Sequence, residues 1–346
     1  MFAYDIYEDQ HEIMMMLSYD ELKEEFKNNA DRFAYIDFML RFTGTIKRSD
    51  IGTQFNLSEA AASKVLKLYN DARPNNMRYD HSIRANILEK SYEPLLEWRA
   101  EVALGMLANG FNKNKLSETI KTVIPYEKIT SLPDQMKVET VSAITRAISG
   151  GRSVICEYYS KSGQGRSKRE LVPLEILNDG EFWMFRAYDR SETSSNRSKF
   201  KFFNFSRVLS LVGNPHETTS KRKEYENIKY DTDWNLEVPL DLKLHEDLEE
   251  KEQEEIRIDF GLSSGVNQLI ILKRVAFLWI LKNKWKIDTR TPEKIEEEKI
   301  QHAEVKKQLG DNYMIKRKKY KFRLCNLEMI QMLLEQNNSF SKLHDE

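Results

Sequence analysis

The chain has 346 residues, which at about 150 residues per domain corresponds to two or three domains. Hydrophobic residues make up 40% and charged residues 32%, so the chain can bury real cores and is unlike a disordered protein. Lys plus Arg number 54 against 55 Asp plus Glu, a net charge of −1, which excludes a globally basic nucleic-acid coat but not a local basic patch. No apolar run approaches the ~20 residues of a membrane helix, and the acidic first ten residues are unlike a signal peptide. The two cysteines form no CxxC pair, so we expect a cytoplasmic, multidomain protein with no disulfide framework, zinc site, cofactor or membrane partner.

The charges are segregated along the chain. Residues 1–40 carry ten acids against three bases, a local net of −7, whereas residues 41–90 carry nine bases against five acids, a net of +4. Residues 152–222 also lean basic, and residues 241–259 are acidic. The basic segments are where an anionic partner would bind.

The N-terminal third has the element order of a winged helix. Apolar residues recur at helical spacing between residues 19 and 42, and two short amphipathic helices are predicted over 48–55 and 58–69, with Ser58 as the N-cap of the second. After a turn at 73–76, residues 77–79 and 83–88 are predicted as two short strands. A helix–turn–helix followed by a hairpin is the arrangement of a winged helix.

A recognition helix has to fit a groove about 12 Å wide, so its exposed face needs small, polar and basic residues. In the helix predicted over 58–69, Val65, Leu66 and Leu68 are expected to face the core. The opposite face and the hairpin supply candidates for base edges and phosphates. The residues that we expect to contact DNA are Lys47, Arg48, Ser58, Ala60, Ala61, Ser63, Lys64, Lys67, Arg78, Tyr79, His81 and Arg84. An ordinary helix pair with a solvated basic face is the alternative.

From residue 152 the periodicity changes to that of strands. Strand-like runs are predicted over 153–159, 170–176, 182–188 and 200–208, which favours a small, strongly bent sheet or open barrel. The tail is predicted as a strand over 236–244, an acidic helix over 246–254, a strand over 256–260, a long apolar helix through 275–281 and a charged helix over 294–308. This order indicates a third, α/β module.

Two motif series resemble one known family. The N-terminal third resembles the winged helix of the BrxR/CapW-type WYL-domain transcriptional regulators. The residues at its motif positions are Arg32, Gly44, Arg48, Ser58, Ala62, Ser63, Lys64, Tyr69, Tyr79 and Asp80. Residues 152–211 are similar to a WYL domain in their order of strand, Tyr-x-Ser, Arg-x-x-x-Pro, Trp and Ser-Arg-apolar motifs, although Leu174 and Met184 stand where the family often has His. Residues 238–288 resemble the family's C-terminal extension.

The resemblance implies an α+β multidomain fold. Its parts are an N-terminal helical extension (1–30), a winged helix-turn-helix (31–98), a helical linker or dimerisation region (99–150), a WYL domain with an Sm-like β-barrel (151–215) and a WCX-like α/β extension (216–346). It also implies a homodimeric repressor of a phage-defence operon, of the BREX or CBASS kind, which binds double-stranded DNA at an inverted repeat. The WYL domain is then expected to sense a nucleic-acid or nucleotide-like ligand.

The proposed WYL ligand site carries several arginines. The residues that match it are Tyr159, Ser160, Arg169, Arg186, Tyr188 and Arg207. Converging guanidinium groups suit phosphate, and an aromatic ring can stack a base. The alternative for Arg169 and Arg207 is structural pairing with Glu157, Glu170 or Asp189, and Trp183, Phe185 and Phe203 are expected in the core.

Catalysis finds little support in the sequence. The six histidines show no HExxH or HxH spacing, and no GxSxG, Walker A or GxGxxG motif occurs. Asp241, Glu246, Asp247 and Glu249 are expected on a solvated helix face, and Cys156 is expected to be inert. We therefore predict no catalytic residues. The runner-up function is a WYL sensor that binds single-stranded nucleic acid and signals to a protein effector, and a nuclease is the third class.

Overall fold

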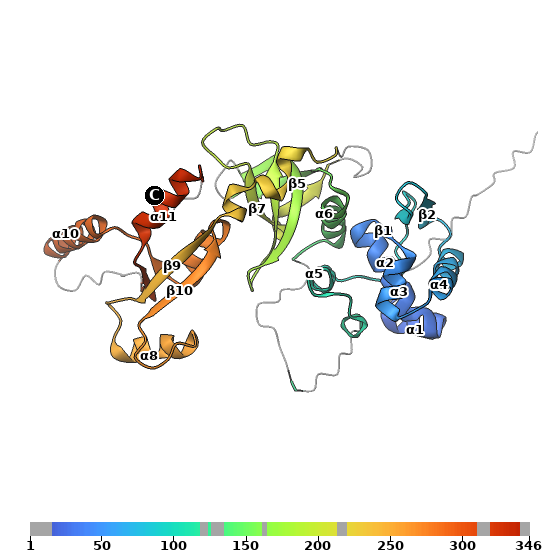
Figure 1. Ribbon diagram of the computed structural model, residues 1–346, viewed down its shortest axis with the longest axis horizontal. Coiled ribbons are helices and arrows are strands. Elements are labelled where there is room, and N and C mark those ends of the chain that lie inside the picture. The colour runs from blue at the N-terminus through green and yellow to red at the C-terminus, as the bar shows by residue number, and fades with distance from the viewer. Residues whose placement is uncertain are drawn as a thin grey trace, which may run out of the picture. The chain divides into compact units, whose positions relative to one another are not determined.

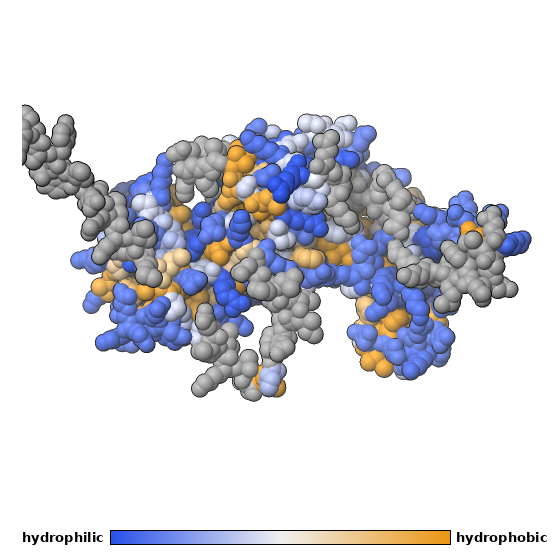
Figure 2. All heavy atoms as spheres, turned by 180° about the vertical axis from the view of Figure 1, so that it is seen from behind, coloured by the Kyte–Doolittle hydropathy of each residue, from blue (hydrophilic) through white to orange (hydrophobic). Residues whose placement is uncertain are grey.

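The chain divides into two compact units in the computed structural model, which describes residues 16–117, 124–125, 135–160, 165–212, 220–309 and 319–339. The first unit contains Met1–Thr193 and Lys199–Lys223, and the second contains Ser194–Ser198 and Glu224–Glu346. The surface seen in Figure 2 is mostly hydrophilic and carries several apolar patches. No helix in the described part of the chain is both long and apolar enough to span a membrane.

The first unit begins with a winged helix-turn-helix. Its helices are α1 (Tyr19–Phe26), α2 (Ala30–Thr43), α3 (Arg48–Phe55) and α4 (Glu59–Ala72). Its strands are β1 (Thr45–Ile46), β2 (Met77–Asp80) and β3 (Ala85–Leu88), which form a sheet of order β1-β3-β2. Helix α3 and the hairpin are confirmed close to their expected bounds. The helical stretch between residues 19 and 42 is divided by a 3-10 turn at Lys27–Asn29, where two consecutive asparagines are weak helix formers.

Helix α6 connects the winged helix to the central sheet. Helices α5 (Ala100–Asn109) and α6 (Val138–Gly150) follow the hairpin, and α6 packs against both α2 and strand β5. In Figure 1, α6 lies beside the sheet that contains β5. One continuous hydrophobic core extends from the winged helix through α6 into this sheet.

The central sheet has five strands in the order β7-β6-β5-β4-β8, with antiparallel pairing throughout. The strands are β4 (Val154–Ser160), β5 (Gly165–Asn178), β6 (Trp183–Asp189), β7 (Phe200–Asn204) and β8 (Val208–Leu211). The run expected over 200–208 is divided by a 3-10 turn at Phe205–Arg207, so one predicted strand is two. The sheet ends at β7 and β8 and is not a closed barrel, so the Sm-like closure is not confirmed.

The second unit contains a four-stranded sheet of order β10-β9-β12-β11. Its strands are β9 (Glu237–Leu244), β10 (Gln268–Arg274), β11 (Ile287–Asp288) and β12 (Phe322–Leu324). Its helices are α7 (Thr232–Asn235), α8 (Glu250–Asp259), α9 (Leu278–Lys284), α10 (Pro292–Leu309) and α11 (Leu327–Gln336). Figure 1 shows β9 and β10 side by side, with α8 in the connection between them. Ile256 of α8 and Ile330 of α11 contribute to the core of this unit.

Two predictions for this unit are wrong. Residues 256–260, expected as a strand, belong mostly to α8, because a short apolar run has no period that separates a strand from a buried helix turn. The long apolar helix through 275–281 is preceded by strand β10, which the sequence analysis missed, and α9 is only a short helix.

Candidate nucleic-acid interface

Helix α4 presents two faces of opposite character. Its N-terminus is capped by Ser58, whose Oγ accepts a hydrogen bond from the Ala61 amide at 3.3 Å. Its buried residues are Ala62, Val65, Leu66 and Tyr69. The other face exposes Lys64 and Lys67. Leu68, expected in the core, is 36% exposed, because it lies one turn after Lys64 on the flank of the helix.

The predicted DNA-contacting residues lie on the surface of the winged helix. Those that are exposed are Lys47, Arg48, Ser58, Ala60, Lys64, Lys67, Arg78, Tyr79, His81 and Arg84. Ala61 and Ser63 are half-buried, and the Ser63 hydroxyl donates to the Glu59 carbonyl at 2.9 Å. Arg78 forms an ion pair with Glu89 at 2.7 Å. Ser63 and Arg78 therefore already have partners within the chain, whereas the lysines of α4 point into solvent.

The tip of the wing has a defined conformation. The Asp80 carboxylate accepts hydrogen bonds from the Ser82 hydroxyl at 2.6 Å and amide at 2.8 Å, and these bonds lower the pKa of Asp80. The rings of Tyr79 and His81 meet edge to face, 4.9 Å between centroids. Arg84 ends the turn with φ +51°, a left-handed conformation that is uncommon for a side-chain-bearing residue. These contacts define the backbone of the turn and the relative orientation of the Tyr79 and His81 rings.

A buried carboxylate that the sequence analysis did not single out holds α4 in place. Asp37 of α2 is fully buried and accepts hydrogen bonds from five donors. The donors are Tyr69 Oη (3.0 Å), Tyr92 Oη (2.8 Å), Leu95 N (3.0 Å), Leu96 N (3.3 Å) and Trp98 Nε1 (2.9 Å). Burial, and next the charge of Asp37, raises the pKa values of Tyr69 and Tyr92 well above the ordinary value for a phenol. Both hydroxyls therefore remain neutral hydrogen-bond donors. The available signal was an acid inside the apolar run of residues 34–40.

The predicted ligand residues of the central sheet lie on both of its faces. Residues paired across an antiparallel ladder share a face, and neighbours along a strand alternate between faces. By this register Arg169 shares a face with Asp189, whereas Arg186 and Tyr188 lie on the opposite face. The fold does not bring the proposed arginines together into one cluster.

Arg169 is neutralised within the chain. Its Nη1 lies 2.7 Å from Oδ2 of Asp189, which is fully buried, and Lys201 Nζ lies 3.6 Å from the same oxygen. This is the structural pairing that the sequence analysis gave as the alternative. Of the three aromatic residues expected in the core, Phe185 and Phe203 are buried and stack with their ring centroids 5.6 Å apart, whereas Trp183 is half-buried.

The other ligand candidates differ in exposure. On the face opposite Arg169, Arg186 is buried and stacks over the Phe202 ring at 4.6 Å, and Tyr188 is buried. Tyr159 is half-exposed, Ser160 is half-buried at the end of β4, and Arg207 is exposed in the turn after β7. Arg207 interacts with the Tyr158 hydroxyl. Burial raises the pKa of Tyr158, and the Arg207 charge partly opposes that rise.

The two cysteines differ in exposure. Cys156 is buried, and burial raises the pKa of its thiol to about 12, in agreement with the expectation that it is inert. Cys325 is exposed. Within the described ranges, no three His, Cys, Asp or Glu side chains are grouped to hold a metal ion.

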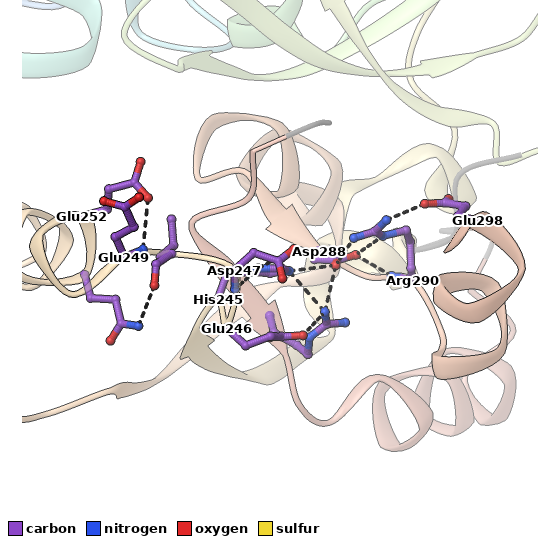
Figure 3. A network of polar contacts seen from close by, with 11 residues as sticks. His245, Glu246, Asp247, Glu249, Glu252, Asp288, Arg290 and Glu298 are labelled. Atoms are coloured by element: carbon purple, nitrogen blue, oxygen red, sulfur yellow. Dashed lines mark hydrogen bonds and ion pairs between the residues drawn. The ribbon is translucent and has the colours of Figure 1, made fainter. Parts of the chain in front are cut away.

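The second unit contains a buried polar network (Figure 3). Asp247 N–H donates to His245 Nδ1 at 3.2 Å, and His245 Nε2 lies 3.1 Å from Asp288 Oδ2. Asp288 also accepts from Arg290 Nε at 2.9 Å and lies 3.2 Å from Arg323 Nη2. Burial alone would raise the pKa of Asp288, but the hydrogen bonds from Arg290 and His245 lower it below its ordinary range. The network pairs each charge with an opposite one, as in a structural ion-pair cluster.

The acidic residues expected on one solvated helix are not on one helix. Asp241 lies in β9 and accepts from Gln268 Nε2 at 2.6 Å. Glu246 pairs with Arg323, and α8 begins at Glu250, after Asp247 and Glu249. The expectation was wrong because the charge pattern alone does not show where the helix begins.

Comparison with known proteins agrees with this architecture. Residues 28–107 match the family described as the BrxR transcriptional regulator winged helix-turn-helix domain, and residues 139–212 match the WYL domain. The chain is 26% identical over 244 residues to the DNA-binding transcriptional repressor CapW of Escherichia coli (strain KTE188), covering 68% of this chain and 75% of that protein. It is 24% identical over 262 residues to CapW of Pseudomonas aeruginosa, covering 72% and 80% of the two chains.

Solved structures are less similar. Proteasome accessory factor B/C (PafBC) of Arthrobacter aurescens matches with a TM-score of 0.20 and 16% identity, covering 66% of this chain and 38% of that one. A CRISPR Cas-related protein matches with a TM-score of 0.32 and 12% identity, covering 84% and 83%.

Proposed function

Because the chain carries a BrxR-type winged helix-turn-helix domain and a WYL domain, we propose that it is a non-enzymatic, DNA-binding transcriptional repressor. The observation that carries the proposal is the exposed face of α4, where Lys64 and Lys67 lie beside the small residue Ala60. Small residues let a helix approach base edges closely, and the lysines meet phosphates. The CapW relatives are named as DNA-binding transcriptional repressors, which supports the same function.

We further propose that two copies bind an inverted repeat. In such a complex each α4 enters a major groove, and the exposed Arg84 and His81 of the wing reach the adjacent backbone or minor groove. The five-stranded sheet, as an Sm-like module, would sense a nucleic-acid or nucleotide-like ligand and so control a phage-defence operon. Tyr159 and Arg207 are the exposed candidates for that contact, because Arg169 is already paired with Asp189.

The test is DNA binding by the full chain, measured by fluorescence anisotropy on its own upstream duplex and on a scrambled duplex across a salt series. Selective binding by two protomers per site supports the proposal. Replacing Lys64 and Lys67 by Ala should weaken binding and reduce the salt slope by about one per lost phosphate contact. Lys115→Ala is the matched control, since Lys115 is exposed outside α4. Weak and equal binding to both duplexes would instead support the sensor that signals to a protein effector.

A further inference from the structure

A cleft opens between the base of the wing and helix α6, away from the surfaces discussed above. We call it the wing–α6 cleft, and its volume is about 250 Å³. Its lining includes Gly44, Ile87, Leu88, Arg146, Gly150 and Val154. All of these residues belong to the first unit, and α2 and α6 pack directly against each other there. The cleft therefore adjoins both the DNA-binding domain and the helix that leads into the central sheet.

One wall of the cleft carries the guanidinium group of Arg146, whose positive charge is not balanced by a carboxylate among the described residues. Arg146 of α6 donates from Nη1 to the main-chain carbonyl of Arg41 at 2.6 Å, and in the described part of the chain it forms no ion pair with a carboxylate. The nearby Glu139 instead lies 3.6 Å from Arg41. Burial, and to a smaller degree the charge of Arg41, lowers the pKa of Arg146 to about 10, so the group is still a cation at neutral pH.

Arg146 helps to cap the C-terminal end of α2, but this cap uses only part of its hydrogen-bonding capacity. The carbonyl of Arg41 belongs to the last turn of α2, and a cation there complements the helix dipole. A guanidinium has five N–H donors in a planar fork, and a single carbonyl uses one of them. Gly44 ends α2 with φ +82°, and a Cβ at this position would lie 3.5 Å from Arg146 Cδ. The left-handed φ is what favours glycine here, since a Cβ at that distance from Arg146 would be in ordinary van der Waals contact.

The remaining walls define the class of ligand. Ile87, Leu88 and Val154 are apolar, and Arg146 supplies the positive charge. A phosphate ester offers three terminal oxygens to the N–H groups of Arg146 that the Arg41 carbonyl does not use, whereas a carboxylate offers two. The volume of about 250 Å³ is below the usual range of pockets for drug-sized ligands, roughly 300–1,000 Å³, so the ligand must be small.

We propose that the wing–α6 cleft binds a small organic phosphate, with its phosphate on Arg146 and its apolar part against Ile87, Leu88 and Val154. Because Leu88 N–H donates to the Gly44 carbonyl at 2.9 Å, the ligand contacts the segment that ties β3 of the wing to the end of α2. Occupation of the cleft then changes DNA affinity, because it favours one arrangement of the wing against α6. This second step rests on the proposed repressor function, whereas ligand binding itself does not.

The binding test uses isothermal titration calorimetry on the full chain with two phosphates and their neutral counterparts. Phenyl phosphate is compared with phenol, and adenosine monophosphate with adenosine. Phenyl phosphate should bind at least ten-fold more tightly than phenol. If adenosine monophosphate shows the same preference over adenosine, the cleft accepts nucleotides; if it does not, the ligand is a simple phosphate ester. Arg146→Gln should lose that preference. Arg99→Gln, at an exposed arginine of the same unit, should keep it.

A second variant keeps the test informative if Arg146→Gln folds poorly. A Cβ on Gly150 would meet only Arg152 Cδ, at 3.9 Å, so the position has room for a side chain, and we expect Gly150→Met to fill part of the cleft while Arg146 itself is kept. It should abolish phosphate binding. Equal affinity for charged and neutral probes, or unchanged phosphate binding in Gly150→Met, would overturn the site. If the phosphate binds but does not shift DNA affinity by about five-fold to 150-fold, the coupling is wrong and the site stands. Failure of DNA binding itself, with phosphate binding intact, would refute the repressor function alone.

Discussion

The buried carboxylate of Asp37 offers the sharpest test of how the DNA-binding domain is held together. Asp37→Asn preserves the size of the side chain and removes its charge, so no cavity confuses the result. The asparagine keeps one carbonyl oxygen, which can accept two of the five hydrogen bonds that converge there. Its NH2 group then faces the two donors that Oδ2 of Asp37 served, the indole of Trp98 and the amide of Leu96.

The expected cost follows from the donors left without an acceptor. A buried donor without a partner costs about 1–3 kcal/mol, and Asp37 serves five of them in a fully buried position. Part of this cost is offset, because folding of the variant no longer removes a charged carboxylate from water. Breaking a buried charge network typically destabilises by about 3–5 kcal/mol, and we expect Asp37→Asn to fall in that range. Since a domain is stable by only about 5–15 kcal/mol, the loss is a large fraction of the total.

Hydrogen exchange followed by mass spectrometry can locate the effect. Each 1.4 kcal/mol corresponds to ten-fold, so amide protection in α2, α4 and the segment 92–98 should fall about a hundred-fold to a few thousand-fold. Peptides from strands β9 and β10 should be unchanged, because they belong to the other unit. DNA affinity should fall as well, since Tyr69 of α4 is bonded directly to Asp37.

The matched control is Asp71→Asn, the same change at an exposed position of α4. It should change the free energy of unfolding, as reported by amide protection, by no more than about 0.5 kcal/mol, the usual range for a surface substitution. If Asp37→Asn behaved like this control, the hydrogen bonds of Asp37 would not hold α4 in place.

Three further predictions follow from other parts of the molecule. Alanine at Lys64 and at Lys67 should each lower the slope of log affinity against log salt by about one, as anisotropy would show; an unchanged slope in both would remove α4 from the interface. Thiol alkylation at pH 8 should modify the exposed Cys325 and leave the buried Cys156 unmodified until urea unfolds the chain, which mass spectrometry of the peptides would report. The pKa of Asp288 is lowered by folding, so its contribution to stability is present above the unfolded value of about 4 and is lost as pH falls below it. Acid unfolding of Asp288→Asn should therefore be less steep than that of the native chain, and equal steepness would contradict the pairing in the network.

Local patterns in the sequence were sufficient for much of the winged helix. Ser58 as an N-cap, the 3.6-residue spacing of Val65 and Tyr69, and the turn before β2 each depend on residues close together in the chain, which is why α3, α4 and the hairpin lie near their expected positions. The exposure of Lys64 and Lys67 follows from the same period. The second unit was predicted less well, because short apolar runs such as 256–260 and 268–274 carry no period long enough to separate helix from strand.

The partners of the polar side chains were decided only by the tertiary structure. Arg169 and Arg186 look alike in sequence, but the register of β5 and β6 places them on opposite faces and gives Asp189 to only one of them. Asp37 meets Tyr92 across 55 residues of chain, and Arg146 meets the end of α2 across 105. Periodicity and capping are properties of neighbouring residues, whereas the partner of a buried charge is set by which distant segments pack together. The sequence by itself therefore determined the kind of domain and its exposed cationic helix, and the tertiary structure decided which charges are paired and which remain available to a ligand.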